Sequence, residues 1–190
     1  MKIILASASP RRKELLKLIY EEFEIRPSDA DESLPDELAA DKAAEYLACM
    51  KAGSVAKDAN ELVIGCDTVV VTDNKILGKP KNRSDCFDML RMLSGRRHYV
   101  YTGVCIHYNN AVMSFTEKTE VEFYELSDKK IERYMDTGEP FDKAGGYGIQ
   151  GKGALLVKGI CGDYFNVVGL PVSSLAQKLD EFLKKQHIKP

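Results

Sequence analysis

Asp67 is the one carboxylate within the apolar segment Leu62-Val63-Ile64-Gly65-Cys66-Asp67-Thr68-Val69-Val70-Val71, which has the composition of a buried strand. Burying an ionised carboxylate without a partner is costly. Asp67 should therefore either lie at the edge of a cleft where it faces a cation or have a shifted pKa. Both situations are typical of a reactive carboxylate. The alternative is that the strand ends at Gly65 and that Asp67 and Thr68 form a bulge or turn.

A second candidate lies near the start of the chain, where Leu5-Ala6-Ser7-Ala8-Ser9-Pro10-Arg11-Arg12 has the pattern of a strand end, a polar turn and a helix start. Ser9 is a favourable N-cap, and Pro10 suits the first helical position. The N–H groups of that helix end, together with the guanidinium groups of Arg11 and Arg12, would bind phosphate oxygens. The alternative is an ordinary first helix with surface arginines.

Two lysines have positions that favour contact with an anion. Lys51 shares one helix face with Leu47 and Val55, so its ammonium lies in or beside an apolar stripe. Lys79 lies in the turn Leu77-Gly78-Lys79-Pro80-Lys81, which could project it into a cleft. Extension of Lys51 to the surface and an ordinary basic turn at Lys79 are the alternatives.

The acidic segment Asp29-Ala30-Asp31-Glu32 precedes the helix that carries Lys51. A divalent metal that also binds phosphates needs carboxylate ligands of this kind, so the segment is a candidate metal site. The alternative is that these residues serve only the helix start and solubility.

The segment 142–153 is rich in glycine and contains Gln150. Glycines allow backbone N–H groups to approach a ligand closely, and the Gln150 amide can offer a nucleobase both a donor and an acceptor. The segment lacks the P-loop pattern. A flexible hairpin is the alternative.

The elements that would position these residues alternate between strands and helices, which is typical of an α/β fold. A turn at Asn109-Asn110 joins two long strands in the second half. We expect strands at Lys2–Ala6, Phe23–Arg26, Leu62–Val71, Lys75–Leu77, His98–His107, Ala111–Tyr124 and Ala154–Lys158, and helices at Pro10–Tyr20, Asp36–Lys57, Ser84–Leu93, Ser127–Met135 and Val172–Lys185.

Composition narrows the class of protein. With 190 residues, of which 44% are hydrophobic and 29% charged, the chain can form one large domain or two intimate lobes. Its apolar stretches are shorter than the ~20 residues of a membrane span, and its start does not resemble a signal peptide, so we expect a cytoplasmic protein. A net charge of −2 gives no reason to expect nucleic acid. The five cysteines and three histidines lack zinc-site spacing, which favours reduced thiols.

In this order, the segments above resemble the Maf family of nucleoside triphosphate pyrophosphatases. The resemblance covers nearly the whole chain. It implies one domain over 1–190 with a fold related to the inosine triphosphate pyrophosphatases, in which helices flank a long mixed sheet in two lobes around a cleft. The motifs that carry it include Leu5–Leu16, Asp31-Glu32, Lys51-Ala52, Gly65–Val70, Leu77–Pro80, Leu93–Val104, Asp142–Gly151 and Gly162–Pro171.

The resemblance also implies hydrolysis of a nucleoside triphosphate to a monophosphate and pyrophosphate. Asp67 matches the general base, which would deprotonate water for attack on the α-phosphorus. Mg²⁺ or Mn²⁺ would be held by Glu32 and Asp67. The remaining positions that bind phosphate or support turnover are matched by Ser7, Arg12, Lys51 and Lys79.

Arg11, Thr68 and Gln150 resemble the subgroup that acts on dTTP and UTP, since the subgroup for 7-methyl-GTP has an aromatic residue at the position of Arg11. The amide of Gln150 matches the O4 and N3–H edge of thymine or uracil. Such an enzyme could clear non-standard nucleotides. Two alternatives are a nucleotide-binding regulator of septum formation with slow turnover and a protein-interaction module. The oligomeric state stays open, with a homodimer as one option.

Overall fold

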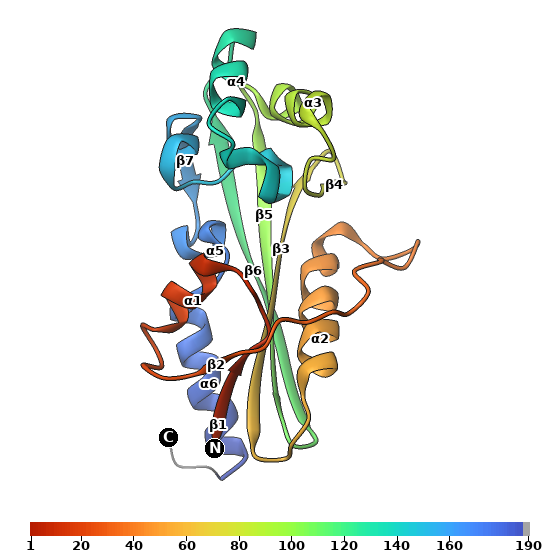
Figure 1. Ribbon diagram of the computed structural model, residues 1–190, viewed down its shortest axis with the longest axis vertical. Helices are drawn as coiled ribbons and strands as arrows, with labels where there is room; N and C mark the ends of the chain where they lie inside the picture. The colour runs from red at the N-terminus through yellow and green to blue at the C-terminus, as the bar shows by residue number, and fades with distance from the viewer. Residues whose placement is uncertain (188–190) are drawn as a thin grey trace. The chain divides into compact units, whose positions relative to one another are not determined.

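The computed structural model describes residues 1–187. In this part of the chain seven strands form one sheet in the order β2-β1-β3-β5-β6-β7, and β4 pairs with β3 beside that path (Figure 1). β1 is parallel to β2 and β3, whereas the pairs β3–β4 and β6–β7 are antiparallel, so the expected mixed sheet is confirmed. The strands are β1 (Lys2–Leu5), β2 (Glu24–Ile25), β3 (Glu61–Thr72), β4 (Lys75–Leu77), β5 (Arg97–Tyr108), β6 (Ala111–Phe123) and β7 (Val157–Cys161).

The helices include several short 3₁₀ turns. No helix within residues 1–187 is long and apolar enough to cross a membrane. The α-helices are α1 (Pro10–Leu16), α2 (Ala43–Val55), α3 (Arg83–Leu93), α4 (Asp128–Met135), α5 (Tyr164–Val168) and α6 (Val172–Lys185), and the 3₁₀ helices are η1 (Ala40–Lys42), η2 (Glu139–Asp142), η3 (Ala144–Gly146) and η4 (Gly151–Leu155).

The chain divides into two compact units. The first consists of 1–67, 102–117 and the C-terminal segment from Gly169, and the second of 68–101 and 118–168. Strands β3, β5 and β6 each contribute residues to both units.

In the first unit, α2 and α6 lie on opposite sides of the strands (Figure 1). The small residues Ala48 and Ala52 of α2 pack with Ile4, Val63 and Cys105 in one buried cluster. Because alternate residues of a strand point to opposite faces, helices on both sides require strands that are apolar throughout. β3 meets this requirement over residues 62–66, a stretch that contains no polar or charged side chain and is buried at every residue.

In the second unit, α3 and α4 pack against each other over a core that includes Phe123 and Tyr147. The Tyr147 hydroxyl lies 2.7 Å from Nε2 of the buried His98. Burial lowers the pKa of His98 to about 4, so the imidazole is neutral near pH 7.

The boundaries differ from expectation at several places. α1 ends at Leu16 instead of Tyr20, because the chain continues in short turns over residues 17–19. α2 starts at Ala43 instead of Asp36, since Ala43 is the first residue of the segment to be buried. β7 lies at Val157–Cys161 instead of 154–158, because η4 extends to Leu155. The glycine-rich segment is therefore partly helical and not an open loop.

Candidate active site

Asp67 and Lys51 form an ion pair in the first unit. Asp67 lies within β3 and Lys51 on α2, and the Lys51 Nζ is 2.5 Å from the Asp67 Oδ1. Each side chain is only 12% exposed. The prediction that Asp67 lies within a strand opposite a cation is confirmed, and the alternative of a strand that ends at Gly65 is wrong.

Gly65 brings the two side chains together. It precedes Asp67 by two residues and therefore presents the same face of β3 to α2. A Cβ atom at Gly65 would lie 2.3 Å from the carbonyl oxygen of Ala48 and 2.8 Å from the backbone nitrogen of Ala52. Only glycine allows this approach of helix to strand, which sets the distance between Lys51 and Asp67.

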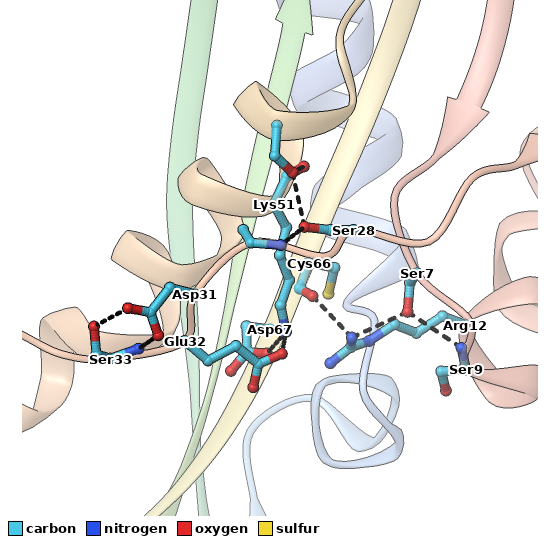
Figure 2. A network of polar contacts seen from close by, with 12 residues as sticks. Ser7, Ser9, Arg12, Ser28, Asp31, Glu32, Ser33, Lys51, Cys66 and Asp67 are labelled. Atoms are coloured by element: carbon cyan, nitrogen blue, oxygen red, sulfur yellow. Dashed lines mark hydrogen bonds and ion pairs between the residues drawn. The ribbon is translucent and has the colours of Figure 1, made fainter.

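Glu32 is the second anion at the same ammonium. Its Oε1 lies 2.8 Å from the Lys51 Nζ, although 59% of its side chain is exposed. Figure 2 shows how its loop is held: the Asp31 carboxylate accepts bonds from the backbone N–H and the hydroxyl of Ser33, at 3.0 and 2.8 Å. A turn closed on both sides of Glu32 therefore directs its carboxylate towards Lys51.

Lys51 is a cation in this environment and not a proton acceptor. Burial alone would lower the pKa of its ammonium, but the adjacent carboxylates of Asp67 and Glu32 outweigh burial and raise that pKa above its usual value. The cluster of Glu32, Lys51 and Asp67 thus has two negative charges and one positive charge.

The carboxylates of Glu32 and Asp67 have the chemistry of ligands for a divalent metal that is also coordinated by a substrate. Both already converge on a single cationic atom, the Lys51 Nζ. Mg²⁺ is commonly bound by one or two carboxylates together with substrate phosphates and water. Within residues 1–187 no three His, Cys, Asp or Glu side chains gather as a complete protein cage. Glu32 and Asp67 are therefore suited to a metal that arrives with phosphates.

Arg12 and Ser7 form a second polar group, which contacts β3 at the backbone of Cys66. The Arg12 guanidinium donates to the carbonyl oxygens of Cys66 and Gly169, at 2.8 and 2.9 Å, and lies 3.3 Å from the Ser7 hydroxyl. Figure 2 shows the contacts of Arg12 with Ser7 and Cys66 beside Asp67. Because Cys66 directly precedes Asp67, the Arg12 guanidinium is bound to the residue next to the one that carries the carboxylate.

The expected helix cap is only partly present. Ser9 occupies the N-cap position of α1 and Pro10 the first turn, but the Ser9 side chain makes no capping bond. The Ser9 N–H instead donates to the Ser7 hydroxyl at 3.3 Å. Arg11 lies half-buried on this helix. The segment thus organises Ser7 and Arg12 through side-chain contacts.

The contribution of Gly169 was missed by sequence reasoning. Its carbonyl oxygen accepts from Arg12 and also from the Cys66 thiol, at 3.2 Å. Burial raises the pKa of that thiol to about 11, so Cys66 is not a nucleophile near neutral pH. Every residue type has a backbone carbonyl oxygen, so no residue pattern indicates this contact, and the only sequence signal is the Gly-Leu-Pro turn before α6.

Three further candidate residues, Thr68, Lys79 and Gln150, belong to the second unit. Thr68 follows Asp67 in β3 and is half-buried, whereas Lys79 and Gln150 are exposed. The Gly145 N–H donates to the carbonyl oxygen of Gly78 at 2.9 Å, so the turn that carries Lys79 is bonded to the glycine-rich segment. The structure thus brings together Glu32, Lys51 and Asp67, and separately Ser7 and Arg12.

Comparison with known proteins shows a match between this chain and a known family. The family model described as "Maf-like protein" matches residues 2–182. A protein of Thermosipho africanus named dTTP/UTP pyrophosphatase is 53% identical over 175 residues, which cover 92% of this chain and 90% of the relative. A Bacillus cereus protein of the same name is 47% identical over 182 residues, 95% of each chain.

Solved structures support the fold. The Ham1 proteins of Staphylococcus aureus and Coxiella burnetii align with TM-scores of 0.58 and 0.55 at 16% and 15% identity. Each alignment covers 95% of this chain and 99% of the other. From the family match over nearly all of its residues, we conclude that the chain belongs to the Maf family.

Proposed function

We propose that this protein is a metal-dependent nucleoside triphosphate pyrophosphatase that hydrolyses dTTP and UTP to the monophosphate and pyrophosphate. The observation that carries the proposal is the cluster of Glu32, Lys51 and Asp67, in which two carboxylates share one ammonium on a side chain that is only 12% exposed. The names of the two relatives, both dTTP/UTP pyrophosphatases, support the same activity.

In the proposed mechanism, Asp67 accepts a proton from the water that attacks the α-phosphorus. Its place within a rigid, buried strand supports this role, because a general base must be held in one geometry relative to the water. The pyrophosphate leaves as the α–β bond breaks. A divalent metal held by Glu32 and Asp67, Mg²⁺ or Mn²⁺, would neutralise phosphate charge when bound.

The cations of the site stabilise the negative charge of the phosphates. Lys51 keeps its ammonium charged, and the guanidinium of Arg12 is fixed by the carbonyl oxygens of Cys66 and Gly169. Fixed positive groups of this kind provide most of the rate enhancement in phosphoryl chemistry. We assign phosphate contacts to Ser7, Arg12, Lys51 and Lys79.

We assign recognition of the base to Gln150, assisted by Arg11 and Thr68. The side-chain amide of Gln150 offers one acceptor and a donor, which match the N3–H and O4 groups of thymine and uracil. A base with the opposite pattern would leave the amide unpaired, at a cost of about 1–3 kcal/mol. The expected preference is dTTP and UTP over CTP, with purine triphosphates poor.

The test is a panel of dTTP, UTP, CTP, GTP and 7-methyl-GTP, each with Mg²⁺ or Mn²⁺ and with release of pyrophosphate as the signal. Lys51→Ala should lose activity, whereas Lys57→Ala, an exposed lysine just beyond α2, should not. Release of inorganic phosphate instead of pyrophosphate would contradict the assigned bond. If Lys51→Ala and Lys57→Ala lost the same activity, the cause would be the positive charge of the surface in general and not the position of Lys51.

A further inference from the structure

Gln150, the residue to which we assign contact with the base, lies in a segment that is held by hydrogen bonds on both sides. Gln150 is exposed at the N-cap position of η4, between the buried side chain of Ile149 and the exposed Gly151. Its own side chain makes no capping bond. What fixes the position of this amide in the second unit must therefore come from the neighbouring backbone.

Glu139 fastens the segment on the C-terminal side of Gln150. Its carboxylate accepts the backbone N–H of Lys152, at 3.1 Å to Oε1 and 3.0 Å to Oε2, and that of Gly153, at 3.3 Å to Oε2. Glu139 is half-buried at the start of η2, and its own N–H donates to the Thr137 hydroxyl at 3.2 Å. These are charge-assisted bonds to the first N–H groups of η4, which have no partner within that short helix.

Tyr134 fastens the N-terminal side. Its hydroxyl accepts the N–H of Gly148 at 3.3 Å, and the residue is only 4% exposed. Burial raises the pKa of this phenol to about 12, so it stays neutral. A Cβ atom at Gly153 would lie 2.1 Å from the carbonyl oxygen of Gly148. Residues 148 and 153 are thus in direct contact, and Gln150 lies at the tip of a closed loop.

We infer that Glu139 is a positioning residue for base selection, which holds the amide of Gln150 in place through the backbone of Lys152 and Gly153. The inference rests on the proposed function, because it takes Gln150 as the residue that contacts the base. Glu139 itself need not touch the substrate. Without its carboxylate, two backbone N–H groups lose their acceptor and the loop gains freedom, so the amide no longer favours one base edge.

The test compares kcat/KM for dTTP and CTP in a double-mutant cycle of Glu139→Ala and Gln150→Ala. In the wild-type background, Glu139→Ala should reduce the preference for dTTP over CTP at least about 10-fold. In the Gln150→Ala background it should leave the remaining preference unchanged, because there is no amide left to position. Glu132→Ala, an exposed glutamate of α4, is the matched control and should alter neither value.

Glu139→Gln gives a second measurement that does not depend on how well the alanine variant folds. Its amide oxygen can accept one of the bonds, so the variant should keep more of the preference than Glu139→Ala. Hydrogen exchange at Lys152 and Gly153 should quicken in the order wild type, Glu139→Gln, Glu139→Ala.

Three outcomes would count against these proposals in different ways. A preference that falls equally in both backgrounds would mean that Glu139 acts independently of the Gln150 amide, and would overturn the inference. Unchanged hydrogen exchange in Glu139→Ala would overturn it as well. A wild-type enzyme with equal kcat/KM for dTTP and CTP would instead refute the assigned role of Gln150 and with it the proposed base specificity.

Discussion

Replacing Asp67 by asparagine removes one negative charge and leaves the size of the side chain almost unchanged. Asparagine can still accept a bond from Lys51 through its amide oxygen, but it cannot take a proton from water. Glu32 stays as a carboxylate partner of the same ammonium, at 2.8 Å. The substitution therefore separates the chemistry of Asp67 from its packing.

The cost in stability follows from the ion pair. Exchange of an ion pair for a hydrogen bond from the same ammonium to a neutral amide oxygen costs about 1–2 kcal/mol, and the pair is 12% exposed on each side, so solvent weakens it little. For a chain of this size each kcal/mol lowers the melting temperature by roughly 2–4 °C. Asp67→Asn should therefore melt a few degrees below the wild type and be folded at 25 °C.

The turnover of Asp67→Asn should fall steeply. Loss of a general base costs at least ~100-fold, which is about 2.7 kcal/mol in the activation barrier. The assay is the initial rate of pyrophosphate release from dTTP at 25 °C, together with the melting temperature by circular dichroism with and without nucleotide. Nucleotide should still raise that temperature, because Lys51 and Arg12 remain as phosphate contacts and Glu32 remains as a metal ligand.

The control is Asp88→Asn, an exposed carboxylate on α3, which should behave as the wild type in both assays. Near-normal turnover in Asp67→Asn would refute the assignment of Asp67 as the base. A variant that is unfolded at 25 °C would instead show that the ion pair contributes more to stability than the geometry indicates.

Lys79→Ala should reduce kcat/KM for dTTP, while Lys57→Ala should not. Equal values of kcat/KM in the two variants would contradict the phosphate contact assigned to Lys79. Gln150→Glu should narrow the ratio of kcat/KM between dTTP and CTP, since the carboxylate has no N–H for O4; an unchanged ratio would contradict the assigned role of Gln150. Gly65→Ala places a Cβ 2.3 Å from the Ala48 carbonyl oxygen. This variant should have a free energy of unfolding lower by about 1–3 kcal/mol and a lower turnover. A fully active and stable variant would contradict the close approach of α2 to β3. Stability should also fall on acidification: the pKa of His98 is about 4 when folded, below its value of about 6.5 when unfolded, so the unfolded state binds the proton first. The free energy of unfolding should drop by about 2 kcal/mol between pH 7 and pH 5, and His98→Gln should flatten this dependence in urea titrations; an equal slope in that variant would assign the effect to other groups.

The central strand and the last helix were predictable from the sequence, because apolar patterning fixes both. Leu62–Val71 lies within the observed β3, and α6 matches Val172–Lys185 at both ends. The sequence also indicated that Asp67 faces a cation and that Lys51 faces an anion, but not that the two side chains pair with each other. Lys51 shares a helix row with Leu47 and Val55, which are 6% and 3% exposed, so its ammonium lies beside an apolar stripe.

Features that depend on distant or backbone contacts were not predictable. The placement of Glu32 depends on the turn between Asp31 and Ser33, whose hydrogen bonds leave no trace in hydrophobic periodicity. The glycine-rich segment forms η4 because Glu139, twelve residues before Gly151, caps its N–H groups. Gly169 contributes a carbonyl oxygen, which every residue type has.

The register of β7 was likewise decided by its partner strand. Val157 pairs with Phe123 and Cys161 with Glu120, which places the strand three residues later than its composition indicates. Short strands contain too few residues for their own pattern to fix their ends, so pairing determines them.

Hydrolysis of dTTP in water labelled with a heavy oxygen isotope tests the proposed chemistry most directly, because the label marks the phosphorus that water attacks. If Asp67 activates water for attack on the α-phosphorus, a single turnover with Mg²⁺ or Mn²⁺ places the label in dTMP and leaves the pyrophosphate unlabelled. Mass spectrometry of the two products distinguishes the positions. Label in the pyrophosphate would mean that water attacks the β-phosphorus, and would contradict the proposed mechanism.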